Sequence, residues 1–179
     1  MNVAELSEMV GAEKRALDGI VRKLSTEQFR RPANDKPDVP YEGETLRLNQ
    51  TEQGRQPAPG EWTIRDVLGH IAAYADAQRR SLAAGTGRGR EDVISFEHFQ
   101  AWNEQQYELR RRRTPSQIVA ELQENTARFL SLVKSLHEED LIKTMQYPWP
   151  KQGTVHAFIL ECMEHQREHR EKLGKLVEA

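Results

Sequence analysis

The chain has 179 residues, a formal net charge of −2, a mean hydropathy of −0.79 and an isoelectric point of about 6.3. This balance excludes a general attraction to nucleic acid or anionic membranes, and no apolar run approaches the roughly 18 residues of a membrane span. The single cysteine, Cys162, excludes an internal disulfide and a cysteine-rich zinc module. With no secretory leader visible, we expect a cytoplasmic protein with one domain over 1–179.

The first predicted element is an amphipathic helix from about Val3 to Leu24. Its apolar residues recur mostly at three- and four-residue spacing, which is typical of one buried helix face: Leu6, Val10, Leu17, Ile20, Val21 and Leu24. The composition then changes between 32 and 60, where five of the eight prolines lie. So many helix breakers predict a Pro/Gly-rich loop insertion at 32–60, with a short strand or hairpin arm at 45–49.

A second helix is predicted from Thr63 to about Ala83. Thr63 suits the N-cap, Asp66 follows three residues later as in a capping box, and Trp62 precedes the cap as an apolar staple. The residues expected on its buried stripe are Ile64, Val67, Leu68, Ile71 and Ala75.

Three further helices are predicted along the rest of the chain. One carries Phe96, Phe99 and Trp102 and ends near Arg113, and the next begins at Thr114-Pro115. A loop is expected at 143–153, after which Thr154 begins the last helix, ending near residue 177. Long amphipathic helices with one loop-rich insertion predict an all-α protein that folds as a helical bundle.

Two histidines of the last predicted helix, His165 and His169, lie four residues apart. This spacing places both imidazoles on one face, with Cβ atoms about 5–6 Å apart, where two neutral imidazoles bind one transition-metal ion. They share a stripe with Phe158 and Cys162, so we expect them to point toward the core. His70, at the border of the second helix's stripe, is the candidate for a third ligand.

Other interpretations of these histidines stay open. Each could be a residue at the core edge with an ordinary hydrogen-bond partner. The segment from His165 to His169 also fits the H-x-x-E-H pattern of inverted zinc proteases, although only ten residues follow it to supply a further acidic ligand. The other histidines lie near predicted helix ends, where we expect surface or capping roles: His98, His137 and His156.

The candidates for acid–base groups near such a site are Tyr74, Glu161 and Glu164. Tyr74 lies one helical turn after His70, but an aromatic residue at this position is equally typical of core packing. Glu164 could instead face solvent or accept a hydrogen bond from a ligand imidazole. We expect Cys162 to be a buried thiol.

Two segments resemble one known family. The chain is similar in two places to the DinB-like superfamily of four-helix bundles. These places are Trp62-Thr63-Ile64-Arg65-Asp66-Val67-Leu68-Gly69-His70-Ile71 and the later Glu164-His165-x-x-x-His169. This group includes YfiT-type proteins described as metal-dependent hydrolases and bacillithiol- or mycothiol-dependent transferases and isomerases. The resemblance implies a divalent metal ion, most simply Zn²⁺ or Ni²⁺, bound by His70, His165 and His169.

The resemblance also implies a function. We expect a metal-dependent enzyme that acts on a small-molecule substrate, either a hydrolase or a thiol S-transferase that uses a low-molecular-weight thiol. We expect a homodimer that binds neither nucleic acid nor membrane. The alternative is a non-catalytic bundle, a stress or small-molecule-binding protein whose histidines are structural, because one fold hosts many functions.

Overall fold

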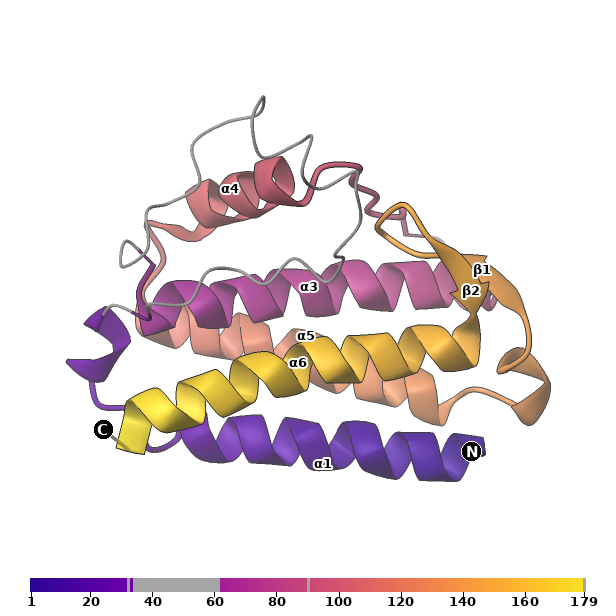
Figure 1. Ribbon diagram of the computed structural model, residues 1–179, viewed down its shortest axis with the longest axis horizontal. Coiled ribbons are helices and arrows are strands. Elements are labelled where there is room, and N and C mark those ends of the chain that lie inside the picture. The colour runs from indigo at the N-terminus through magenta and orange to yellow at the C-terminus, as the bar shows by residue number, and fades with distance from the viewer. Residues whose placement is uncertain (32, 34–61, 90, 179) are drawn as a thin grey trace.

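The computed structural model of the protein describes residues 1–31, 33, 62–89 and 91–178 (Figure 1). Within them, the α-helices are α1 (Val3–Val21), α3 (Ile64–Gly85), α4 (Phe99–Arg110), α5 (Pro115–Lys134) and α6 (Val155–Glu178). Two short 3₁₀ turns, η1 (Gln28–Arg30) and η2 (Glu138–Asp140), follow α1 and α5. The insertion expected at 32–60, with its strand at 45–49, lies outside the described residues except for Ala33.

Four of the helices form a bundle, which confirms the predicted all-α fold. Helix α1 packs against α5 and α6, and α3 packs against the same two helices, so the four close into a ring. Helix α4 lies outside this ring against α3, on the side away from α1 (Figure 1). No helix in the described part of the chain is long and apolar enough to cross a membrane.

Local capping explains where the bundle helices begin. At α3 the Thr63 backbone N–H donates to the Asp66 carboxylate over 2.9 Å, as the sequence predicts. At α5 the Gln117 backbone N–H donates to the Thr114 hydroxyl, and Pro115 occupies the first turn. At α6 the Thr154 hydroxyl accepts from the Ala157 N–H over 3.2 Å. These caps set the register in which α3 and α6 present their inward faces.

The prediction of a loop at 143–153 is wrong in part. Strands β1 (Thr144–Gln146) and β2 (Gln152–Thr154) pair antiparallel there, with Met145 opposite Gly153. Three-residue strands are too short to show an alternating pattern in the sequence. The turn between them buries Tyr147 and Trp149, whose rings lie 4.7 and 5.8 Å from the Phe158 ring at the start of α6.

Phe96 was expected in the third helix, but it lies before α4. Its backbone N–H donates to the carbonyl of Pro148 over 2.8 Å, which connects the segment before α4 to the β1–β2 hairpin. Its ring stacks on Trp102 at 4.3 Å between centroids. The aromatic packing that suggested a helical position is therefore real, although the backbone is not helical there.

The apolar interior divides into two clusters along the bundle. One cluster, toward the β1–β2 hairpin, includes Tyr74 of α3 and Met163 of α6. The other, toward the start of α3, includes Leu68 and Leu173. The inward-facing residues between these positions on α3 and α6 include histidines, so a polar layer separates the two clusters.

Substitution of Phe158 with alanine tests the first cluster. Phe158 is fully buried, and we expect Phe158→Ala to lower the free energy of unfolding by about 3–5 kcal/mol, because it removes apolar contacts and leaves a cavity. Urea unfolding followed by circular dichroism measures the loss. Ile142→Ala, at a side chain that is 79% exposed, is the control and should change little. A Phe158→Ala protein as stable as the control would contradict this account of the core.

Asp140 joins its own segment around η2 to the segment that follows α3, and it provides a pH test. Its carboxylate pairs with Arg88 over 2.6 Å and with Lys143 over 2.7 Å, and it accepts from the His137 backbone N–H. Burial raises the pKa of this carboxyl group, but these three donors outweigh burial and leave the pKa well below its usual range. Its stabilising effect is therefore complete above the unfolded pKa of about 3.9 and is lost as the pH falls below it.

We expect Asp140→Asn to lower the free energy of unfolding by about 1–2 kcal/mol at pH 7, since water partly screens a pair this close to the surface. The difference from the wild type should narrow below about pH 4, where the wild-type group also begins to lose its charge. Urea titrations at the two pH values measure it. Glu124→Gln, which breaks an exposed ion pair with Arg128, is the control. A difference independent of pH would show that the carboxylate charge is not the cause.

Candidate metal centre

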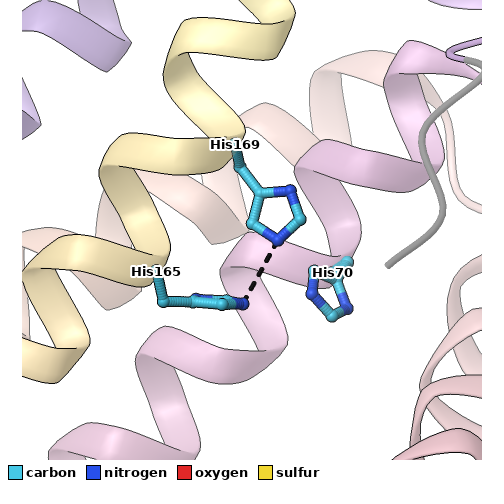
Figure 2. A group of neighbouring side chains, drawn as sticks. All are labelled: His70, His165 and His169. Atoms are coloured by element: carbon cyan, nitrogen blue, oxygen red, sulfur yellow. Dashed lines mark hydrogen bonds between the residues drawn. The ribbon is translucent and has the colours of Figure 1, made fainter. Parts of the chain in front are cut away.

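Three histidines meet between α3 and α6 (Figure 2). His70 comes from α3, and His165 and His169 come from successive turns of α6, which packs against α3. One ring nitrogen from each lies within 4.8 Å of those of the other two. The residues are 3%, 6% and 1% exposed, respectively, so the group is closed off from bulk water. We call this group the histidine triad.

The α6 pair is spaced as two ligands of one ion would be. The Nε2 atoms of His165 and His169 lie 3.2 Å apart, facing each other (Figure 2). Two nitrogens bound to one tetrahedral Zn²⁺ at about 2.0–2.1 Å would be about 3.3 Å apart. The pair therefore fits a shared ion with little movement, and His70 faces it at ring-centroid distances of 5.4 and 4.9 Å.

Burial favours the neutral, metal-binding form of two of the three histidines, His70 and His165. Burial lowers the pKa of His70 well below its usual range, and electrostatic interaction with His169, His165 and Arg110 lowers it further. Burial and His169 lower the pKa of His165 in the same way. Since a metal ligand must be a neutral imidazole, both side chains are ready to coordinate at neutral pH without first losing a proton.

His70 supplies the test of whether a metal fits. Both of its ring nitrogens are buried, and neither has a hydrogen-bond partner among the described residues. Buried polar atoms without partners are costly, and they are rare in native proteins unless a ligand or water completes them. A cation beside the triad would satisfy one His70 nitrogen and could replace the hydrogen bond between the two α6 nitrogens. The three residues therefore fit a metal ion.

Tyr74 lies beside the triad, one turn along α3 from His70. Its ring centroid lies 4.5 Å from those of both His70 and His165. The hydroxyl is buried and has no hydrogen-bond partner among the described residues. Burial raises its pKa far above the usual value, so the group stays protonated and serves as a hydrogen-bond donor rather than as a base.

The two glutamates considered from the sequence lie outside this group. Glu161 pairs with Lys151, and exposed Glu164 pairs with Arg167 over 3.1 Å. Neither carboxylate joins the cluster of candidate ligand atoms in the described part of the chain. Cys162 is a buried free thiol whose pKa is raised, chiefly by burial, so it is not an activated nucleophile.

The other three histidines are also separate from the triad. His98 and His137 immediately precede α4 and η2, and His156 lies in the first turn of α6. None of them is a member of the cluster formed by His70, His165 and His169. Their positions at helix starts match the expectation from the sequence.

The sequence did not single out Asn103, a residue of α4 that faces the triad side of α3. Asn103 is 2% exposed and, with His70, Gln106 and Arg110, lines a cavity of about 10 Å³, roughly the space of one water molecule. A signal existed: Asn103 follows Phe99 by four residues, so it occupies the buried face of an aromatic helix where an apolar residue is usual.

Comparisons with known proteins agree with this architecture. A crystal structure of an uncharacterised protein from Escherichia coli UTI89 matches with a TM-score of 0.65, covering 99% of this chain and 93% of that chain. The two sequences are 15% identical, so the likeness shows a shared fold alone. No curated protein sequence matches this chain. The family model of the DinB superfamily matches residues 11–173, nearly the whole chain, and the protein therefore belongs to the DinB superfamily.

Proposed function

We propose that the protein is a metal-dependent enzyme that acts on small molecules, with one divalent ion bound by His70, His165 and His169. The observation that carries this proposal is the buried triad itself, whose ligand atoms lie within 4.8 Å and whose His70 nitrogens have no hydrogen-bond partner among the described residues. Membership of the DinB superfamily supports a metal-binding role. Zn²⁺ and Ni²⁺ are the simplest occupants, because both accept imidazole ligands.

Three protein ligands leave one coordination position for water, a thiolate or a substrate. A bound ion would polarise that ligand and lower its pKa, which supports either hydrolysis of a small electrophile or attack by a low-molecular-weight thiol. Tyr74 is the protein group best placed to donate a hydrogen bond to a reacting oxygen, since its hydroxyl is protonated and has no hydrogen-bond partner in the described part of the chain.

Metal content provides the first test. After incubation with Zn²⁺ or Ni²⁺ and desalting, we expect about one ion per wild-type chain by inductively coupled plasma mass spectrometry. His165→Ala should weaken binding more than about 100-fold, because it removes one of three ligands. His156→Ala is the matched control: it removes a histidine of the same helix outside the triad and should leave the metal content unchanged. A wild-type protein without metal would contradict the proposal and favour the alternative in which the histidines are structural.

Activity is tested on the metal-loaded protein with two assays, hydrolysis of an activated small ester and addition of a small thiol to an aromatic electrophile. We expect turnover in one of them by the wild type, and none by His165→Ala. Tyr74→Phe should keep its metal and its fold, since it removes a hydroxyl without a described partner, but should lower kcat about 100-fold. An unchanged kcat for Tyr74→Phe would exclude the tyrosine as a donor. Bound metal without turnover in either assay would favour a non-catalytic binding protein.

A further inference from the structure

Asn103 is a polar residue in an apolar setting. It lies on α4, 2% exposed, next to Trp102, whose ring meets that of Tyr74 edge-on at 4.7 Å. Neither its carboxamide oxygen nor its amide nitrogen forms a hydrogen bond with any described residue. A buried carboxamide with both ends unpaired is destabilising, and an apolar side chain of similar size would cost less there. Its presence on this face therefore needs an explanation other than packing.

Two residues near Asn103 also carry buried polar atoms without a hydrogen-bond partner among the described residues. His70 lines the same small cavity as Asn103, and both of its ring nitrogens lack described partners, as does the hydroxyl of Tyr74. An imidazole that binds a metal through one nitrogen carries a proton on the other, and this N–H requires an acceptor. A carboxamide offers an acceptor at one end and donors at the other, so one asparagine can serve both residues.

The electrostatic influence of Asn103 matches these roles. Burial lowers the pKa of His70 and raises that of Tyr74, and in both cases Asn103 acts in the opposite direction. An oxygen that accepts from a ring N–H, and an amide that donates to a phenol oxygen, would have these two effects. The carboxamide thus lies near both groups.

We propose that Asn103 is a positioning residue of the metal site: its carboxamide oxygen accepts from the His70 ring N–H that faces away from the metal, and its amide donates to the Tyr74 hydroxyl oxygen. This inference rests on the proposed metal site. It makes α4, which lies outside the bundle, part of the functional centre. Asn103 fixes which His70 nitrogen is free to coordinate, and it leaves the Tyr74 O–H free to point at a substrate.

The test compares Asn103→Leu with Asn103→Asp. Zn²⁺ affinity is measured by chelator competition, the Co²⁺ site by its visible absorption spectrum, and the metal-free protein by thermal unfolding. We expect Asn103→Leu to bind Zn²⁺ about 10–100-fold more weakly and to shift the Co²⁺ spectrum, because His70 loses the partner that orients it. Asn103→Asp keeps an acceptor for His70 and should restore the affinity to within a few-fold of wild type.

Asn125→Leu is the matched control. Asn125 is a buried asparagine of α5 that donates to the Ala72 backbone carbonyl over 3.0 Å, so its role is structural. Asn125→Leu should lower the Tm of the metal-free protein without changing Zn²⁺ affinity. Asn103→Leu should do the reverse: the metal-free Tm stays the same or rises, because an unpaired buried carboxamide has been removed.

Two results would overturn the inference. One is an Asn103→Leu protein with wild-type Zn²⁺ affinity and Co²⁺ spectrum. The other is an Asn103→Leu protein whose metal-free Tm falls as far as that of Asn125→Leu, which would make the residue structural. A wild-type chain that binds neither Zn²⁺ nor Co²⁺ would instead refute the metal site on which the inference rests, so the two failures are distinguishable.

Discussion

Three imidazoles buried between two helices are the constraint around which this bundle is organised. The closest pair has its Nε2 atoms 3.2 Å apart in a region from which water is excluded. Such an arrangement is unfavourable unless the nitrogens share a proton or a cation. The surrounding apolar clusters, one on either side of the triad along α3 and α6, hold the rings at this distance. Packing thus supplies the free energy that keeps the polar group assembled.

The position of α4 changes how the site is understood. Helix α4 packs on α3 beside the triad, where Trp102 contacts Tyr74 and Asn103 lines a small cavity with His70. The aromatic side chains exclude water, whereas the carboxamide offers hydrogen bonds toward the triad and Tyr74. A chemically specific centre therefore depends on a helix that contributes little to the closure of the bundle itself.

Much of this arrangement could be predicted from local sequence patterns. The caps at Thr63 and Thr114 and the four-residue spacing of His165 and His169 are short-range signals, and the structure has each of them where expected. The position of His70 beside a buried helix stripe, together with the resemblance of 62–71 to the DinB-like superfamily, made it the candidate third ligand, and it lies beside the other two histidines. Such signals survive in one sequence because the partners lie within a turn or two of each other.

What the sequence did not reveal depends on contacts between distant segments. The β-hairpin at 144–154 is stabilised by Phe158 and by the strand pairing itself, and neither produces a periodic pattern in the sequence. The non-helical position of Phe96 follows from a backbone hydrogen bond to Pro148, far along the chain. The spacing of Asn103 from Phe99 places it on a buried helix face, but the groups that it meets there follow only from the packing of α4 on α3. In each case the decisive neighbour lies more than 25 residues away or in a hairpin too short to recognise.

The placement of the triad also bears on how the chain is held together. With a single cysteine, this chain cannot form an internal cross-link of its own. An ion at the triad would join α3 to α6 and close a loop of about half the chain, which includes α4, α5 and the β1–β2 hairpin. Closing so long a loop reduces the conformational entropy of the unfolded chain if the ion stays bound there. One ion could then act both as a Lewis acid and as a cross-link between α3 and α6. Unlike a disulfide, this cross-link would form and break with the metal supply rather than with the redox state.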